Sequence, residues 1–217
     1  MLIYVATKNG GKLRELRQLF APFGWRLETY IGYADVAEGD TSYAENAALK
    51  AAALHAQLRS AGESANVLGD DSGLEVSALG GRPGVLSARY GGAQASWHER
   101  RAHLLAELAA TGSADRSARF VCALHFIGGD GRVRAVLREV AGTIASTEAG
   151  ERGFSYDPIF WYPPAGKTFA ELTDSQKNRI SHRGLAARAL VDLGGSAPGG
   201  GTENERPPVK SSADAGM

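Results

Sequence analysis

The chain has 217 residues, of which 43% are hydrophobic and 22% are charged, as is typical of a soluble globular protein with a hydrophobic core. Its 24 basic and 24 acidic residues balance, which argues against a general nucleic-acid or membrane-surface binder, because such proteins need a basic excess. A single cysteine, Cys122, excludes a disulfide framework and a thiolate-rich zinc site. We therefore expect a cytoplasmic protein that contacts neither membrane nor nucleic acid.

Apolar runs alternate with helical spacings along the chain, and this pattern predicts an α/β fold with a mixed sheet. The expected elements, in chain order, are a buried strand over 2–6, a helix over 11–21, a strand over 26–30, a helix over 42–58, a helix over 96–110, a hairpin of strands over 118–127 and 133–140, a short strand over 159–162 and a helix over 174–193. Val67 and Leu68 are expected to lead into a loop rich in Gly, Asp and Ser. Residues 194–217 are rich in Gly and Pro, which predicts a disordered tail after one folded domain over 1–193.

The turn after the first strand is the first candidate site. It consists of Thr7, Lys8, Asn9, Gly10, Gly11 and Lys12. Open α/β sheets place ligands at the carboxyl ends of strands, and a helix amino terminus offers N–H groups and a positive dipole end to an anion. The pattern is equally that of a turn followed by a helix cap, and the turn alone does not decide between the two interpretations.

Two adjacent carboxylates, Asp70 and Asp71, form the second candidate site. Neighbouring negative charges repel, and a hard cation such as Mg²⁺ relieves that repulsion. Glu38 and Glu45 are further acidic candidates for the same ion. The alternative interpretation is an Asp-rich turn without a metal.

A basic stretch over 177–184 is the third candidate site. Helical spacing places Lys177, Ser181 and Gly184 on one face, with His182 and Arg183 beside them. A solvated basic helix is the alternative. Three other patterns fail their tests: residues 166–168 lack the rest of a phosphate-binding loop, His98 and His103 are five residues apart rather than four, and residues 153–157 lack the second glycine of a nucleophile elbow.

Taken together, these segments resemble the inosine triphosphate pyrophosphatase family, of the Ham1/RdgB type. The matching segments, in the family's order, are residues 6–12, 43–51, 70–90, 153–160, 166–168 with 170–172, and 177–184. Ser155 departs from the family, which commonly has Gly at that position. Separate motifs in the correct order are far more specific than any one of them alone.

The resemblance implies a mixed, elongated sheet flanked by helices, with two lobes around a central substrate cleft, and a homodimer. It implies hydrolysis of ITP, dITP and XTP to the monophosphate and pyrophosphate with Mg²⁺, which would remove these nucleotides from the pool. It also implies roles for particular residues: Asp71 as catalytic residue and metal ligand, and Glu38 as a second ligand. Substrate would be bound by Thr7, Lys8, Asn9, Gly10, Gly11, Lys12, Ser72, Phe154, Ser155, Tyr156, Asp157, Lys177, His182 and Arg183.

Two rival functions stay open at this point. A Maf-like pyrophosphatase would share the fold but act on other nucleotides, and a non-catalytic nucleotide-binding module would lack the acidic metal ligands. Asp70 and Asp71 argue against the second. The donor-rich pair His182 and Arg183 predicts a preference for bases with a 6-oxo group, because an adenine amino group would leave those donors unpaired.

Overall fold

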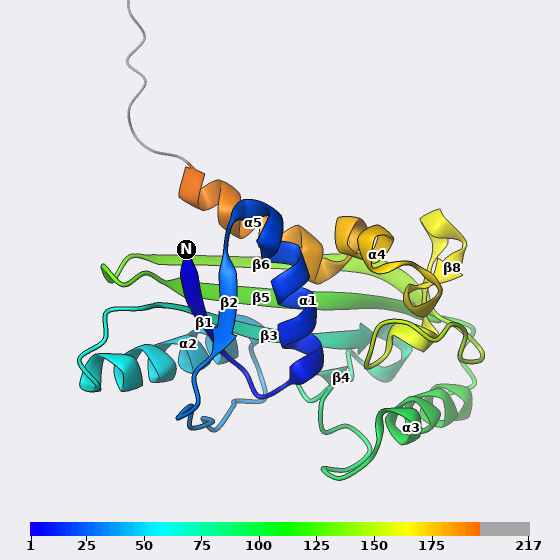
Figure 1. Cartoon of the computed structure of the whole chain (residues 1–217). Helices are drawn as coiled ribbons and strands as arrows, with labels where there is room; N and C mark the ends of the chain where they lie inside the picture. The colour runs from blue at the N-terminus through cyan, green and yellow to red at the C-terminus, as the bar shows by residue number, and fades with distance from the viewer. Residues whose placement is uncertain (196–217) are drawn as a thin grey trace, which may run out of the picture.

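A computed structural model describes residues 1–195 and shows a mixed α/β fold (Figure 1). The strands are β1 (Leu2–Ala6), β2 (Arg26–Thr29), β3 (Asn66–Val76), β4 (Pro83–Gly84), β5 (Ser117–Ile127), β6 (Val133–Ile144), β7 (Phe160–Tyr162) and β8 (Lys167–Thr168). The helices are α1 (Gly10–Phe20), α2 (Tyr43–Ser60), α3 (Trp97–Ala110), α4 (Asp174–Ile180) and α5 (His182–Gly195). Of the tail predicted over 194–217, the first two residues belong to α5, and 196–217 lie outside the described residues.

The eight strands form one sheet in the order β2-β1-β3-β5-β6-β7-β8, with β4 paired to β3. β1 runs parallel to β2 and β3, whereas β5 pairs antiparallel with β3 and β6. The sheet is therefore mixed, as predicted. Within the described residues, no helix is both long enough and apolar enough to span a membrane.

The prediction of a loop after Val67 and Leu68 is wrong. The strand β3 continues to Val76, and Asp70 and Asp71 lie in the middle of it. The strand pairs with β5 along this stretch, and Asp70 lies opposite Leu124. Polar residues and glycines favour loops when read locally. Here the tertiary structure overrides that preference, because each carboxylate finds a cationic partner on its own face of the sheet.

The single helix predicted over 174–193 is also wrong, because the chain breaks at Ser181. Ser181 has extended backbone angles (φ −71°, ψ 156°) and separates α4 from α5. Its Oγ accepts a hydrogen bond from Gly184 N at 3.2 Å, a local bond that competes with helix continuation. Lys177, Ser181 and Gly184 consequently do not share the face of one helix.

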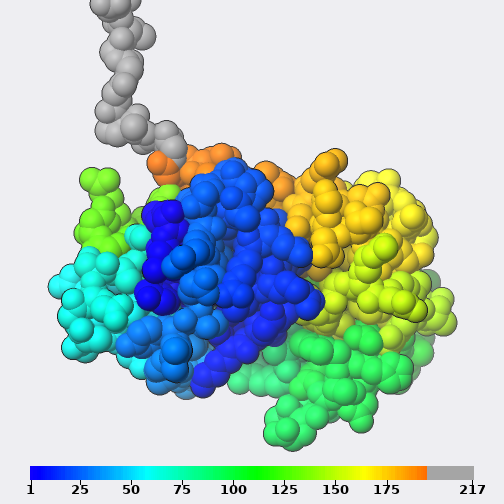
Figure 2. Space-filling model, in the orientation of Figure 1, coloured from blue at the N-terminus to red at the C-terminus, as the bar shows by residue number. Residues whose placement is uncertain are grey.

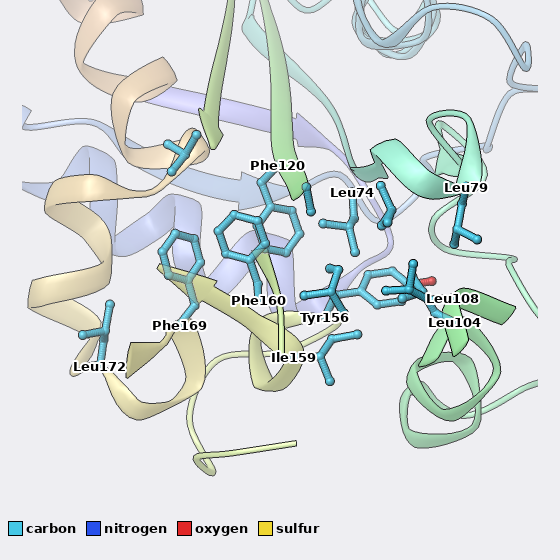
Figure 3. Packing of buried hydrophobic residues seen from close by; sticks show 14 residues of the cluster. Leu74, Leu79, Leu104, Leu108, Phe120, Tyr156, Ile159, Phe160, Phe169 and Leu172 are labelled. Carbon is cyan, nitrogen blue, oxygen red and sulfur yellow. The ribbon is translucent and has the colours of Figure 1, made fainter. Parts of the chain in front are cut away.

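Helices cover both faces of the sheet. α2 packs against β3 and β5, and α5 packs against β5 and β6. The two helices use opposite faces, because Val121 and Ala123 cluster with α2 whereas Cys122 and Leu124 cluster with α5. A further core cluster includes Phe120, Tyr156, Phe160 and Phe169, with leucines of β3 and α3 beside it (Figure 3).

Candidate active site

A cavity of about 280 Å³ lies where the first turn, β3, the start of α3 and the loop over 153–157 meet. On the face seen in Figure 2, the amino-terminal segment (blue) lies beside the segments that include α3 (green) and the loop (yellow-green). Of the residues to which the family resemblance assigned a role, all except Gly10 and Gly11 line this cavity, whereas the further acidic candidates Asp70 and Glu45 do not. Those that line it are Thr7, Lys8, Asn9, Lys12, Glu38, Asp71, Ser72, Phe154, Ser155, Tyr156, Asp157, Lys177, His182 and Arg183.

The turn before α1 is capped by its own side chain. Asn9 Oδ1 accepts hydrogen bonds from Gly11 N at 2.9 Å and from Lys12 N at 3.1 Å. These two amides of the helix amino terminus therefore have a partner within the turn, contrary to the expectation that they are open to an anion. The side chains of Lys8, which is exposed, and Lys12 supply the positive charge on this wall of the cavity.

Asp71 belongs to an acidic cluster on the α2 face of the sheet. Lys50 Nζ lies 2.9 Å from Asp71 Oδ1 and 2.7 Å from Glu38 Oε1. Asn46 Nδ2 donates to the other oxygen of Asp71 at 3.2 Å. Burial raises the pKa of Asp71 more than Lys12 and Lys50 lower it. This cluster has two carboxylates for one ammonium, which is a surplus of negative charge.

A glycine in β3 allows α2 to approach closely enough to form this cluster. A Cβ at Gly69 would lie only 2.1 Å from the Ala47 carbonyl oxygen of α2. Asn46, Ala47 and Lys50 all lie on the buried face of that helix. The absence of a side chain at Gly69 thus permits the packing that brings Lys50 to Asp71.

Asp70 belongs to a separate cluster on the opposite face. Lys12 Nζ lies 2.6 Å from Asp70 Oδ1, and Arg183 Nε donates to Asp70 Oδ2 at 3.1 Å. Burial alone would raise the pKa of Asp70, but Lys12 and Arg183 hold it well below its usual range. Arg183 also donates to Ser72 Oγ at 3.0 Å and pairs with Glu15. Its guanidinium is therefore held in place by three side chains.

Glu15 extends this second cluster along α1. Besides Arg183, it pairs with Lys177 Nζ at 2.9 Å. Burial opposes its ionisation, but Arg183 and Lys177 outweigh that effect and lower the pKa of Glu15 to about 2. Lys177 Nζ also lies 2.6 Å from Asp157 Oδ2. Glu15 stays ionised at neutral pH and joins the two basic residues that were predicted to bind substrate.

The loop over 153–157 places an aromatic ring beside these cations. Lys177 Nζ and Arg183 Cζ lie 5.1 Å and 5.5 Å from the centroid of the Phe154 ring. Phe154 N donates to Asp157 Oδ2 at 2.7 Å, and a Cβ at Gly153 would lie 2.2 Å from the same oxygen. Glycine at 153 is therefore required for this turn, which fixes the backbone of Phe154.

His182 and Tyr156 are buried parts of the cavity wall. The His182 ring stacks on Phe120 with centroids 4.6 Å apart, and burial lowers its pKa well below the usual value, so the imidazole is neutral. In the part of the chain that the structure describes, His182 Nδ1 is buried without a hydrogen-bond partner. Tyr156 donates its hydroxyl hydrogen to the Ser87 carbonyl at 3.0 Å.

This geometry is accompanied by similarity to known proteins over nearly all of the described chain. A model of the Ham1 family matches residues 3–193. The chain belongs to the Ham1 family. It is 47% identical over 195 residues to a dITP/XTP pyrophosphatase of Thermus thermophilus, a match that covers 88% of this chain and 91% of the relative.

Two solved structures support the fold of this Ham1-family chain. A HAM1 protein from Coxiella burnetii matches with a TM-score of 0.79 and 34% identity, and the Ham1 protein of Staphylococcus aureus with a TM-score of 0.77 and 37% identity. Both matches cover 91% of this chain and 100% of the other chain. They confirm the predicted mixed α/β sheet flanked by helices.

The acidic cluster suits a hard divalent cation. Glu38 and Asp71 offer only oxygen donors, both face the same Lys50 ammonium, and that ammonium leaves one of their two negative charges uncompensated. Among residues 1–195, no group of three or more His, Cys, Asp or Glu side chains could form an all-protein metal cage. Mg²⁺ needs no such cage, because it binds one or two carboxylates together with water and substrate phosphates.

Several residues of the site were not among the predicted ones. They are Asn46, Lys50, Glu15, Trp97 and Phe120, of which Asn46 and Glu15 lie just outside the cavity lining. The sequence of α2 could have indicated Lys50, because this lysine lies on the same helix face as the buried Ala47 and Ala51. A buried lysine needs an acidic partner. Glu15 gave the same signal on α1, whereas nothing local distinguished Trp97 and Phe120 from core residues.

Proposed function

We propose that this chain hydrolyses dITP, ITP and XTP to the nucleoside monophosphate and pyrophosphate in a Mg²⁺-dependent reaction. The observation that carries the proposal is that one cavity brings together an acidic pair, a lysine-bearing turn and an aromatic ring with cations beside it. These are the parts that a nucleoside triphosphate and its metal require. The similarity to a dITP/XTP pyrophosphatase supports the choice of substrate class.

The cavity has one wall suited to the phosphates of the substrate and another suited to its base. Lys8 and Lys12 supply positive charge for the phosphates, and the Phe154 ring offers a face on which a base stacks. Glu38 and Asp71 would hold the Mg²⁺, which neutralises charge on the phosphates when bound. Asp71 also acts as an acceptor for the proton of the attacking water, or orients that water. Asn46 and Lys50 fix the direction of its carboxylate.

The preference for a 6-oxo base belongs to the same proposal. Arg183 uses three of its five N–H groups on Asp70, Glu15 and Ser72, so further donors remain for a substrate oxygen. Arg183→Ala would leave Glu15 and Asp70 short of a cation, so Arg183→Lys is the better test. We expect Arg183→Lys to lower kcat/KM for ITP more than for ATP. An equal loss for both would show that Arg183 acts on the phosphates or on the fold.

The decisive experiment incubates the full-length chain with dITP, XTP, ITP, dATP and dGTP in the presence of Mg²⁺ or EDTA. We expect monophosphate and pyrophosphate from the first three, little turnover of dATP, whose base lacks the 6-oxo group, and none in EDTA. Release of orthophosphate and a diphosphate, or equal turnover of all five, would overturn the proposal. A cytoplasmic location and a homodimer stay predictions, the second of which sedimentation of the purified chain can check.

A further inference from the structure

Ser155 has an unusual backbone conformation in a residue that lines the cavity. Its φ of 60° makes it the one non-glycine residue with a positive φ among residues 1–195. Residues with a Cβ avoid this left-handed region, and they stay there only when their surroundings hold them. The neighbouring turn residue with positive φ, Gly153, meets no such penalty. Hydrogen bonds within the turn join Phe154 to Asp157, and a contact to Ser155 from outside the turn would add to this restraint.

A side chain of α3 supplies such a contact. Arg101 Nη1 donates to the Ser155 carbonyl oxygen at 2.7 Å, a short distance for a bond from a charged donor. Its Nη2 donates to Glu148 Oε2 at 2.9 Å, and the other oxygen of Glu148 lies 3.0 Å from His98 Nδ1. The Arg101 side chain is 12% exposed, so water competes weakly for these contacts. Its Nε is buried without a partner in the described residues, so the two Nη contacts determine how it is placed.

We propose that Arg101, aligned by Glu148, is a positioning residue for the loop that carries Phe154 and Ser155. The restrained carbonyl belongs to the residue directly after Phe154, whose ring lies beside Lys177 and Arg183. By holding Ser155 at a positive φ, Arg101 fixes the ring that faces the nucleobase. The effect falls on substrate binding rather than on the chemical step, because Asp71 and Lys50 lie in a separate cluster. This inference rests on the proposed function.

The test compares Arg101→Met with Arg101→Lys and with a matched control, Arg82→Met. Arg82 forms an ion pair at 2.7 Å with Glu107, which belongs to α3 as Arg101 does. The side-chain hydrogen bonds of Arg82 go to Leu79 and Glu107 and not to the loop over 153–157. For dITP we expect Arg101→Met to raise KM about tenfold, with kcat within about twofold of the parent enzyme. Arg101→Lys retains one charged donor and should recover part of that loss, whereas Arg82→Met should leave both constants unchanged.

A second readout needs no substrate. The amides of Phe154 and Asp157 are hydrogen-bonded within the loop, to Asp157 Oδ2 and to the Phe154 carbonyl. In the nucleotide-free protein we expect their hydrogen exchange to accelerate about tenfold in Arg101→Met and not in Arg82→Met. If the parent chain hydrolyses none of the nucleotides, the proposed function fails, and this exchange comparison still decides the role of Arg101.

The variant Ser155→Gly tests whether Arg101 acts by restraining the backbone at residue 155 or by stabilising the protein in general. Because glycine adopts a positive φ without penalty, the loop with Ser155→Gly should depend less on Arg101. We expect Arg101→Met to raise KM less than about threefold in the Ser155→Gly background. Unchanged KM and unchanged exchange in Arg101→Met would overturn the proposal. So would the same changes in Arg82→Met, or the same penalty in both backgrounds at position 155.

Discussion

Asp70 and Asp71 are consecutive residues of one strand, and their side chains enter opposite faces of the sheet. Around Asp70, three cations (Lys12, Lys177, Arg183) meet three carboxylates (Glu15, Asp70, Asp157). Around Asp71, the ion pairs of both carboxylates, Glu38 and Asp71, are with the single ammonium of Lys50. We call these the balanced cluster and the acidic cluster.

The pKa directions of Asp70, Glu15 and Asp71 follow from this difference in charge. In the balanced cluster the cations overcome the effect of burial and lower the pKa of Asp70 and Glu15, whereas burial raises the pKa of Asp157, whose ion pair is with Lys177. In the acidic cluster burial outweighs the cations and raises the pKa of Asp71. Ionised Asp70 therefore contributes to stability, whereas burial penalises ionised Asp71, a penalty that a bound divalent cation would relieve. The balanced cluster thus contributes ion pairs to the fold as well as cations to the cavity wall, whereas the acidic cluster contributes the carboxylates that we propose hold the metal.

Replacing Asp71 should produce the largest effect on activity. Asp71→Asn keeps the size of the side chain and removes its charge, so we expect kcat for dITP to fall by about 10³-fold or more. Burial disfavours the ionised form of Asp71, but the variant also removes one of the two carboxylates that Lys50 contacts, so the melting temperature should fall less than in Asp70→Asn. Steady-state kinetics and thermal denaturation check both, with the exposed Asp130→Asn as control. Near-normal turnover would contradict the role of the acidic cluster.

The matching change at Asp70 should act on stability. Asp70→Asn leaves the buried Arg183 and Lys12 short of a carboxylate, and breaking a buried ion pair costs about 3–5 kcal/mol. Urea denaturation of Asp70→Asn and Asp71→Asn in parallel measures the contrast. Equal stability of the two variants would show that the clusters do not differ as their pKa values indicate.

Gly69→Ala tests whether close packing of α2 maintains the acidic cluster. The new Cβ would meet the Ala47 carbonyl, so α2 must move away from β3 and carry Lys50 with it. We expect a loss of about 1–3 kcal/mol in unfolding free energy together with a lower kcat. Gly10→Ala is the matched control, because nothing lies within 4 Å of its Cβ position. Unchanged kcat in Gly69→Ala would show that the distance between Lys50 and Asp71 does not matter.

The smallest expected effect concerns acid stability. The pKa of Glu15 is lowered to about 2, so its contribution to stability is complete above the ordinary value of 4.5 and is lost as the pH falls toward 2. Glu15→Gln removes this titration and should reduce the slope of stability against pH in that window by at most about 1.4 kcal/mol per pH unit. Denaturation curves between pH 2 and 5 measure the slope. An unchanged slope would place Glu15 outside the balanced cluster.

Local sequence patterns determined the elements whose residues interact mainly with near neighbours. The strand over 2–6, the helix that begins after Ser42 and the hairpin around residues 128–131 follow from periodicity, caps and turn residues. The order of the motifs also indicated the family. The strand, the helix and the hairpin depend on side chains close together in the sequence, so the physical cause of each lies within the segment itself.

Only the tertiary structure decided which face each aspartate enters and which cation it meets. Lys12 reaches Asp70 from α1 and Lys50 reaches Asp71 from α2, and nothing within residues 69–75 specifies either partner. Local patterns predicted a loop there, because they count the cost of burying two carboxylates without the ion pairs that offset it. Arg101 and Ser155 show the same limit, since their contact joins residues 54 positions apart. Such contacts exist only once the elements are packed, so the division between the two clusters is a property of the fold.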